Sequence, residues 1–562
     1  MPVLSPAPRP CLGDARWPAP RFRDQLRVLW RDADALSLAT LPEQLAGLYG
    51  ARPAFFLEAP LETPVFTGDC VTHDDLARLV ARTAHGLARL GVRAGERVGL
   101  VSRNRIELLF AEFAAAKLGA VSVPMNALLR ADELRALAAD AHVATMVIDR
   151  SVLDDTLRGD RAGFGDVARW VVVTDGEAPP GAARFADLLC GGGDRFPCAP
   201  SRDADLAMLF YTAGTTGAPK GALLTHGALL FAVRSQARLA AWLPARRRSL
   251  ALLVMPLAHT SGHQAMLLQL VLGTPMLLHG RFEPVRVLDA IARHRVTQIS
   301  GVPAMYRMLL DAGAEHADLS SLALVAWGGD AMPPELQARF DAAVRRSRRR
   351  GPRWVSGYGL AETAGQQTRW IGGTRRAPGD VGRPLRGVEV RIVDAAGAPV
   401  ARGGVGELAL RSPGVMQGYW NAPELTREAL GDGWLRTGDL ARRDRLGRLH
   451  LASRKKDVIK VGGYSVFPAE VEHALAAHPD VLAVAVAGVP HAVKGEVPAA
   501  MVVPRPQSGL DEATLLAFAR ERMAPYKAPR HIVLVESIPM SSAWKPKRRE
   551  VAERLRAQLG LG

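Results

Sequence analysis

The chain has 562 residues, of which 48% are hydrophobic and 23% are charged. This composition is that of an ordinary globular protein, and it excludes a mainly disordered chain, a collagen and a coiled coil. The length predicts more than one domain. Four cysteines, none of them in a C-x-x-C pair, form neither a disulfide framework nor a zinc motif, so we expect a reducing, cytoplasmic setting.

The formal net charge is +16, which raises the question of a nucleic-acid partner. Most of this charge comes from arginines spread along the chain, and no aromatic stacking pattern accompanies the clusters at 246–248 and 345–350. We therefore predict no nucleic-acid partner. Lysine, by contrast, is rare and concentrated after residue 454, so the retained lysines are candidates for positions that need a compact ammonium group.

No secretory or membrane-spanning segment is predicted. Residues 1–44 lack the apolar stretch of a signal peptide, and we expect them to form a poorly ordered N-terminal extension. The stretch 249–280 carries no Asp, Glu, Lys or Arg, but Pro256 and polar residues such as His259 interrupt it. It therefore predicts a buried strand, a polar turn and a buried helix rather than a membrane span. Peripheral membrane contact stays open.

From about residue 70, strand and helix patterns alternate. Residues 72–75 form a capping-box-like start, after which apolar residues follow helical spacing up to Leu90. The next predicted elements are a strand at 97–102, a helix at 106–118, a short strand at 121–123, a helix at 131–141, strands at 143–148 and 206–211, a helix at 285–294, and strands at 296–300 and 322–327. This alternation predicts a layered α/β domain.

The pattern changes in the last third of the chain. Strand patterns at 388–394 and 405–411 indicate a β-rich section, and a compact unit follows Arg454. That unit is predicted from an extended stretch at 457–467, helices at 469–477 and 511–523, and strands at 481–489, 499–503 and 531–537. We therefore predict an α/β fold. A large N-terminal domain at 45–453 would hold the layered α/β subdomains and the β-rich section, and a small α+β C-terminal domain would span 454–562.

The strongest local motif is the run YTAGTTGAPKG at residues 211–221. It follows a predicted strand and combines three glycines and three threonines with Lys220. Glycines let backbone N–H groups curl around an anion, hydroxyls add donors, and the lysine supplies a mobile positive charge. The Walker spacing is absent. The run predicts a phosphate-binding loop, with an ordinary Gly/Thr surface turn as the alternative.

This run resembles the phosphate loop YTSGTTGxPKG of the adenylate-forming, AMP-binding superfamily, which holds acyl-CoA synthetases, nonribosomal-peptide adenylation domains and firefly-type luciferases. The resemblance extends over roughly residues 45 to 550, because further motifs follow in the family's order. They are PLAHTSG at 256–262, GGD at 328–330, YGLAET at 358–363, RTGD at 436–439, RKKDVIK at 454–460 and PMSSAWK at 539–545. The stretch KDVIKVGGYSVFPAEVE at 456–472 resembles the acyl-CoA synthetase, or fatty-acid–CoA ligase, branch.

The resemblance implies a reaction in two steps. A carboxylate attacks the α-phosphate of ATP to give acyl-AMP and pyrophosphate, and a thiol then attacks acyl-AMP. Because two anions meet in the first step, positive charge is needed where they react. Lys545 would bridge the carboxylate and the α-phosphate, with Lys547 as the alternative lysine. Glu362 would bind a Mg²⁺ ion that bridges phosphates, and His259 would lie beside the acyl carboxylate and gate the thiol tunnel.

The resemblance also implies a set of binding residues for the nucleotide and coenzyme A. Lys220 and its loop would hold the β- and γ-phosphates, Tyr358 would stack on adenine, Asp439 would accept from the ribose hydroxyls, and Arg454 would contact ribose or phosphate. The structural alternatives are a core aromatic for Tyr358, an ordinary turn for Asp439 and a surface arginine for Arg454. The full set is Thr212, Gly214, Thr215, Thr216, Gly217, Lys220, Gly328, Gly329, Asp330, Tyr358, Gly359, Asp439, Arg454, Lys460, Gly462 and Gly463.

For the second step, the resemblance implies a mobile C-terminal domain with a hinge near Lys456. Rotation would remove Lys545 from the site and bring residues 460–464 to it. The glycines of that segment would let the backbone approach the pantetheine arm, with a hairpin turn as the alternative.

Three departures from the family pattern raise the possibility of altered adenylation. Ala213 replaces a loop serine, Ala361 replaces the threonine of YGxTE, and Trp544 replaces the glycine before the catalytic lysine. A further, milder change is Ser453 in place of a glycine.

The leading prediction is an ATP-dependent acid–CoA ligase that uses ATP, Mg²⁺ and coenzyme A. Segments 263–272, 300–305, 325–327 and 356–357 are apolar or small and hold no acidic group to pair an amino group, which favours a medium- or long-chain fatty acid. The alternatives are an aryl acid–CoA ligase, an acyl-AMP ligase that loads a separate acyl carrier protein, and a degenerate adenylate-binding protein without turnover.

Overall fold

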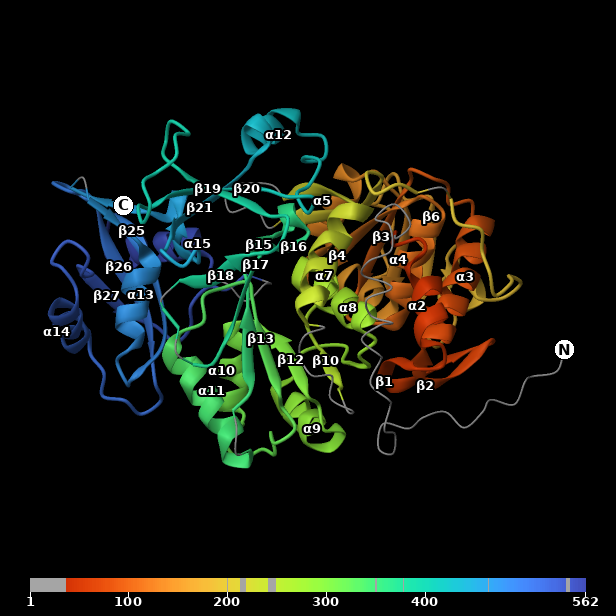
Figure 1. Cartoon of the computed structure of the whole chain (residues 1–562), viewed down its shortest axis with the longest axis horizontal. Helices are drawn as coiled ribbons and strands as arrows, with labels where there is room; N and C mark the ends of the chain where they lie inside the picture. Colours follow the sequence, from red (N-terminus) through yellow and green to blue (C-terminus); the bar gives the residue numbers. More distant parts are fainter. Residues whose placement is uncertain are drawn as a thin grey trace.

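The structure is a computed structural model that describes residues 37–199, 201–212, 219–240, 249–348, 351–374, 376–377, 379–462, 464–541 and 546–561. Within these ranges three large sheets and their helices form layers (Figure 1). The C-terminal unit, drawn in blue, lies at the opposite end of the molecule from the first sheet, drawn in orange, and the largest sheet lies between them. Every helix in the described ranges is too short or too polar to cross a bilayer.

The first sheet has the strand order β7-β6-β5-β3-β4-β8-β9. Strand β3 (Arg97–Ser102) pairs in parallel with β4 (Val121–Asn126) and β5 (Val143–Asp149), because α4 (Ile106–Lys117) and α5 (Ala131–Asp140) provide the crossovers. All of α4 is buried, as expected for a helix inside the protein. The other elements of this layer are α2 (Leu41–Tyr49), α3 (His73–Arg89), η2 (Val152–Thr156), β6 (Arg169–Val173), β7 (Ala183–Arg184), α6 (Phe185–Leu188), β8 (Leu206–Thr212), β9 (Lys220–Thr225) and α7 (His226–Ala240).

The largest sheet has the order β19-β20-β21-β22-β18-β17-β14-β13-β12-β10-β11-β1-β2, with a parallel centre and antiparallel ends. Its central elements are β10 (Ala251–Leu253), α8 (Thr260–Leu272), β11 (Met276–Leu278), α9 (Pro284–His294), β12 (Gln298–Gly301), α10 (Pro303–Asp311), β13 (Leu324–Trp327), α11 (Pro334–Ser347) and β14 (Arg353–Ser356). Its outer elements are β1 (Pro53–Thr63), β2 (Phe66–Thr72), β17 (Thr368–Gly372), β18 (Asp380–Pro384), β19 (Glu389–Val393), β20 (Gly406–Arg411), β21 (Leu435–Arg443) and β22 (Leu449–Arg454). A short hairpin, β15 (Gly359–Leu360) and β16 (Gly365–Gln366), lies beside this sheet and encloses η3 (Ala361–Thr363), and α12 (Pro423–Ala429) and η4 (Gly431–Gly433) precede β21.

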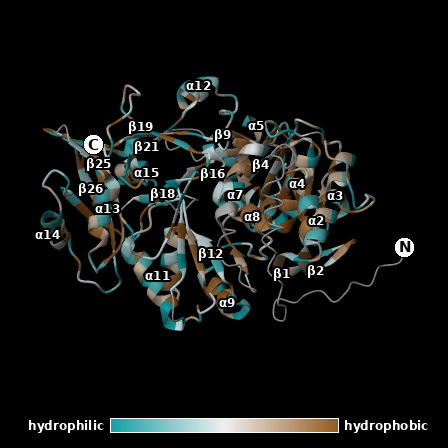
Figure 2. Cartoon of the chain, in the orientation of Figure 1, coloured by the Kyte–Doolittle hydropathy of each residue, from teal (hydrophilic) through white to brown (hydrophobic). Residues whose placement is uncertain are grey.

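The C-terminal unit begins after β22 with a single 3₁₀ turn, η5 (Lys455–Asp457). Its sheet has the order β24-β23-β26-β25, with β27 beside β26, and has its own apolar core. Its elements are β23 (Ile459–Val461), β24 (Tyr464–Val466), α13 (Pro468–Ala476), β25 (Val481–His491), β26 (Gly495–Pro504), α14 (Glu512–Arg522), β27 (His531–Leu534) and α15 (Arg548–Gln558). In Figure 2 the hydrophobic colour concentrates on the packed strands and on helices such as α4, while α14 shows hydrophilic residues at the outside.

The predicted α/β fold class is confirmed. The strand predicted at 97–102 is β3, and the capping box predicted at 72–75 caps α3: Asp75 N donates to Thr72 Oγ1 at 3.0 Å, and Thr72 N donates to Asp75 Oδ2 at 3.2 Å. The uncharged stretch 249–280 forms the predicted strand and helix, β10 and α8. It also contains a second strand, β11, because the three apolar residues after the turn at Gly273 extend along β10.

An aromatic cluster fixes the strands that carry part of the site. Trp354 is fully buried, and its ring centroid lies 6.0 Å from that of Tyr306 and 5.7 Å from that of Trp327. We expect Trp354→Ala to lower the free energy of unfolding by about 3–5 kcal/mol, because it removes this contact area and leaves a cavity. Urea unfolding measures the change. Leu446→Ala, at a position 57% exposed, is the control with an expected loss under about 0.5 kcal/mol. Equal small losses would contradict the packing argument.

Candidate active site

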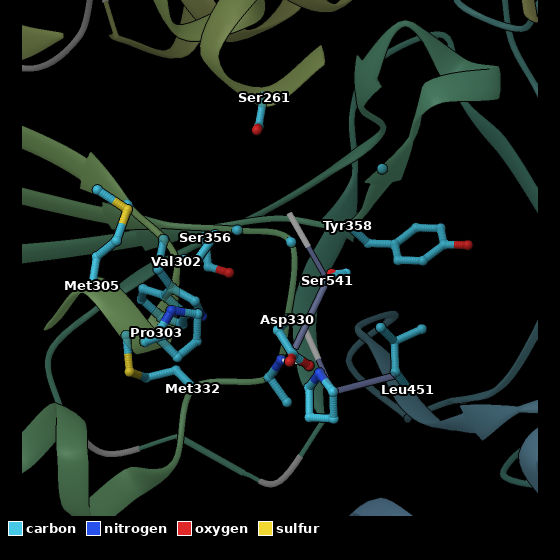
Figure 3. Close-up of a pocket in the computed structure, with 18 of the residues that line it drawn as sticks. Ser261, Val302, Pro303, Met305, Asp330, Met332, Ser356, Tyr358, Leu451 and Ser541 are labelled. Carbon is cyan, nitrogen blue, oxygen red and sulfur yellow. Dashed lines mark hydrogen bonds between the residues drawn. The ribbon is translucent and has the colours of Figure 1, made fainter. Parts of the chain in front are cut away.

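A continuous cavity of about 2690 Å³ lies where the first sheet, the largest sheet and the C-terminal unit meet. Part of it is shown in Figure 3, where Ser261 points inward from α8 and Tyr358, Asp330 and Ser541 surround the opposite part. The predicted site residues that line this cavity are Thr212, Lys220, His259, Gly328, Gly329, Asp330, Tyr358, Gly359, Glu362, Asp439 and Arg454. They come from segments up to about 240 residues apart in the sequence, as the spacing of Thr212 and Arg454 shows.

Asp439 and Arg454 are brought together by strand register. They are direct partners in the antiparallel pair β21 and β22, and Arg454 Nε lies 2.7 Å from Asp439 Oδ1. The Tyr358 hydroxyl donates to Asp439 Oδ2 at 2.5 Å. Burial, and then the Asp439 carboxylate, raise the pKa of Tyr358 well above its usual value, so the phenol stays protonated as a donor. The three side chains thus form one fixed polar group at the cavity wall.

Glu362 and Lys220 are connected through Tyr419, which the sequence motifs did not identify. The Tyr419 hydroxyl donates to Glu362 Oε1 at 2.9 Å, and Lys220 Nζ lies 5.4 Å from the centroid of the Tyr419 ring. Lys456, in η5, also lines the cavity. Burial lowers the pKa of Lys456, the Asp457 carboxylate opposes this shift, and the cations Arg454 and Lys220 lower the pKa further. Three cations, Lys220, Arg454 and Lys456, therefore lie on this side of the cavity, where a polyphosphate could bind them.

His259 lies immediately before α8 and faces the end of β4. Its Nε2 atom is 3.2 Å from Nδ2 of Asn126, the last residue of that strand. Both residues line the cavity. Asn126 was missed by the sequence reasoning, because no motif surrounds it and only the packing of two distant segments brings it to His259.

The turn at 358–366 shows the consequence of one departure from the family pattern. Ala361 lines the cavity, whereas Thr363 is fully buried and its hydroxyl donates within its own turn, 2.8 Å from the Gly365 carbonyl oxygen. Thr363 therefore does not supply the hydroxyl that Ala361 lacks. Gly359 is required for close approach, since a Cβ there would lie 2.2 Å from the same Gly365 oxygen.

Six predicted site residues lie outside the described residues: Gly214, Thr215, Thr216, Gly217, Gly463 and Lys545. The described residues on either side of the last, Ser541 and Pro546, both line the cavity, and Figure 3 shows Ser541 in the same part of the cavity as Asp330. Lys460 and Gly462, in contrast, are not part of the lining. Lys460 is exposed and its Nζ donates to Ser465 Oγ at 2.8 Å. Among its described residues, the C-terminal unit thus presents Ser541 and Pro546, and neither Lys460 nor Gly462, to the cavity.

A hydrogen bond links the C-terminal unit to α10, and ion pairs within the unit fix the Arg548 side chain. Arg307 of α10 donates to the Leu482 carbonyl oxygen of β25. At the start of α15, Arg548 binds Glu472, with Nη1 2.5 Å from Oε1, and its Nε lies 3.3 Å from Asp457 Oδ2. Burial lowers the pKa of Arg548, but the Glu472 carboxylate outweighs this effect and raises it. Asp330, across the cavity, is close enough to add to the rise.

Glu362 is the candidate carboxylate ligand for a magnesium ion in this cavity. Among the described residues, no group of three or more His, Cys, Asp or Glu side chains is arranged to hold a metal ion. Glu362 alone would suit Mg²⁺ that takes its other ligands from phosphate oxygens and water, which this ion commonly does.

Comparison with known proteins places the chain in a family. Residues 49–420 match the AMP-binding enzyme family, and residues 470–545 match the AMP-binding enzyme C-terminal domain. A feruloyl-CoA synthase of Amycolatopsis sp is 37% identical over 497 residues, covering 87% of this chain and 94% of that protein. A long-chain-fatty-acid–CoA ligase of Bacillus subtilis (strain 168) is 31% identical over 517 residues, covering 87% and 90%. The crystal structure of an anthranilate CoA ligase in complex with anthranoyl-AMP aligns with a TM-score of 0.83 at 27% identity, covering 94% of this chain and 99% of that one.

The family match spans most of the chain, and its relatives share the acid–CoA ligase activity while they differ in the acid. The chain therefore belongs to the AMP-binding enzyme family and is an AMP-forming acid–thiol ligase of the acyl-CoA synthetase type.

Proposed function

We propose that this ligase forms an acyl-adenylate in the described cavity and then transfers the acyl group to coenzyme A. The observation that carries the proposal is the convergence of Lys220, Glu362 and the Asp439–Arg454 pair on one cavity, which the residues flanking Lys545 also line. ATP would bind with its ribose at Asp439 and its phosphates at Lys220. A Mg²⁺ ion held by Glu362 would neutralise phosphate charge.

In this proposal Lys545 provides the positive charge that the first step needs between the carboxylate and the α-phosphate. His259, held by Asn126 at 3.2 Å, positions the acid at the start of α8. A swivel at η5 then replaces the 541–546 segment with residues 460–464 for attack by the thiol. The hinge at Lys456 and the domain division at residues 453 and 454 are part of this proposal.

For the acid, an aryl carboxylic acid is the first candidate. Four separate segments line the acyl part of the cavity, and they contribute residues such as Ser300, Met305 and Trp327. This lining is apolar enough for either an aromatic or an aliphatic group. The relatives with the higher identity favour the aromatic acid, since the 37% identical protein is a feruloyl-CoA synthase. A medium- or long-chain fatty acid, the class the sequence favoured, is the second candidate because of the 31% identical long-chain-fatty-acid–CoA ligase.

A panel of acids tests the proposal. Pyrophosphate release would be measured with aryl acids and with fatty acids of several lengths, each with and without coenzyme A. We expect thioester formation with coenzyme A and release of AMP. Acyl-AMP formation without transfer to coenzyme A, but with transfer to an acyl carrier protein, would favour the carrier-loading alternative. Absence of pyrophosphate release with every acid would overturn the proposal.

Lys220→Ala should weaken the use of ATP without blocking the acid. The ammonium group faces the same side of the cavity as Lys456 and Arg454, so its loss removes attraction for the β- and γ-phosphates. We expect the KM for ATP to rise about tenfold or more, the value of one charge-assisted contact, with little change in the KM for the acid. Steady-state kinetics at varied ATP and varied acid separates the two. An unchanged response to ATP would remove this lysine from the nucleotide site.

A further inference from the structure

Residues 416–420 form a strap that joins two elements of the site, β9 and η3. At one end of the strap, Trp420 N donates to the Gly221 carbonyl oxygen of β9 at 2.8 Å. At the other end, Met416 N donates to the Glu362 carbonyl oxygen of η3 at 2.8 Å. Both are main-chain hydrogen bonds, so they hold the strap in place relative to β9 and η3 whatever side chains it carries.

Tyr419 lies in the middle of this strap, where it forms an antiparallel bridge with Ala222 of β9. Its side chain lines the cavity. The hydroxyl donates to Glu362 Oε1 at 2.9 Å, and Lys220 Nζ lies 5.4 Å from the centroid of the ring. One side chain on a fixed backbone therefore contacts both the candidate metal-binding carboxylate and the candidate phosphate-binding lysine.

The hydrogen bond from Tyr419 decides how the Glu362 carboxylate can bind a cation. Because Oε1 accepts the phenol proton, the carboxylate is held in one orientation, and Oε2 is the oxygen that this arrangement offers to a metal ion. Mg²⁺ demands near-ideal octahedral geometry. A carboxylate that is oriented before the ion binds meets this demand at a lower cost than one that must first stop rotating, which is the usual role of a hydrogen bond to a metal ligand.

The contact between the Tyr419 ring and Lys220 acts on the phosphate side of the same cavity. Lysine has a long, flexible stem and loses rotamer freedom when its ammonium group is fixed. The ring attracts the ammonium group, since their separation of 5.4 Å is inside the range of a cation–π interaction. The ring thus restricts the lysine before a nucleotide binds.

We propose that Tyr419 is a positioning residue for ATP and its metal ion. The hydroxyl holds the Glu362 carboxylate in the orientation that binds Mg²⁺, and the ring holds Lys220 on the side of the phosphates. The inference rests on the proposed function and adds to it a residue that lies outside the sequence motifs. Tyr419 acts through Glu362 and Lys220, so its loss should change the binding of ATP and not the binding of the acid.

Two substitutions separate the two contacts. Tyr419→Phe removes the hydroxyl and keeps the ring, whereas Tyr419→Leu removes both. Calorimetry without any acid would measure the affinity for ATP, once with Mg²⁺ and once with EDTA. In Tyr419→Phe, we expect the gain in affinity that Mg²⁺ provides to shrink about tenfold, as for the loss of a hydrogen bond to a metal ligand, while the affinity in EDTA stays unchanged. In Tyr419→Leu, the affinity in EDTA should also fall, by about two- to fivefold.

Tyr49→Phe is the matched control. It removes another tyrosine hydroxyl, which donates to the Val271 carbonyl oxygen at 2.7 Å, from a position outside the cavity lining. Both ATP affinities should stay at their wild-type values in this variant. For Tyr419→Phe, an equal fall of both affinities would indicate general damage, and an undiminished gain from Mg²⁺ would indicate no contact with the metal ligand. Either result would overturn the inference.

Glu362→Gln tests the same contact from the other side. This variant should lose most of the gain from Mg²⁺, and adding Tyr419→Phe should then have no further effect, because the two changes remove one shared interaction. Fully additive losses would contradict the inference. If the wild type binds ATP equally well with Mg²⁺ and with EDTA, the metal role of Glu362 in the proposed function fails, and the inference fails with it. If the wild type shows the gain and Tyr419→Phe keeps it, the proposed function stands and only the inference fails.

Discussion

Lys545→Ala should abolish formation of acyl-AMP while it spares thioester formation from supplied acyl-AMP. The expected loss in the first step is about 1,000-fold, the upper range for removal of one preorganised group that stabilises transition-state charge. The placement of the flanking residues Ser541 and Pro546 on the cavity supports this expectation. The second step should keep its rate, because the proposed swivel carries the lysine away before the thiol attacks. Pyrophosphate release and, separately, turnover of a synthetic acyl-adenylate with coenzyme A measure the two steps.

Lys547→Ala is the matched comparison. Lys547 also lines the cavity, but its ammonium lies 3.6 Å from Glu550 Oε2 on α15 and already has an anionic partner. We expect its loss to cost the first step less than about tenfold. If Lys547→Ala gave the large loss and Lys545→Ala did not, the catalytic assignment would move by two residues. Equal loss of both half-reactions in Lys545→Ala would instead count against the swivel.

Local sequence patterns predicted those parts of the fold that local forces decide. The capping box at Thr72 and Asp75 needs only residues three apart, and β3 is a short apolar run between polar ends, so both were readable from the chain. The strand order of the largest sheet could not be predicted from the sequence. It joins β1, near residue 55, to β11, near residue 277, and such pairings depend on how separate layers pack rather than on any one segment.

The same division holds for the candidate site. Motifs identified Asp439 and Arg454, and strand register explains why residues 15 positions apart become direct partners. Tyr419 and Asn126 carried no signal, because no motif surrounds them and only folding brings them to side chains of other segments, Glu362 and His259 respectively.

Asp439→Asn should impair use of ATP more than any other single change on the nucleotide side. The carboxylate is 9% exposed and holds Arg454 through Oδ1 at 2.7 Å and the Tyr358 hydroxyl through Oδ2 at 2.5 Å. Replacing one oxygen by an NH₂ group places a donor against a donor. It also removes the negative charge that, in the proposed function, accepts hydrogen bonds from the ribose hydroxyls. Because a hydrogen bond to a charged group contributes about 1.5–3 kcal/mol, we expect kcat/KM for ATP to fall about 10–150-fold.

A comparison of ATP with its deoxy analogues tests the proposed ribose contact and separates it from a general loss of activity. The wild-type enzyme should discriminate against 2′-deoxy-ATP or 3′-deoxy-ATP, and Asp439→Asn should lose most of that discrimination, because the acceptor for the missing hydroxyl is already gone. Tyr358→Phe keeps the ring beside the nucleotide and the Asp439 charge, so it should retain the discrimination while it lowers activity less. If Asp439→Asn still distinguished ATP from both deoxy-nucleotides as sharply as the wild type, the ribose would bind elsewhere and Asp439 would serve only to hold Arg454 and Tyr358 in place.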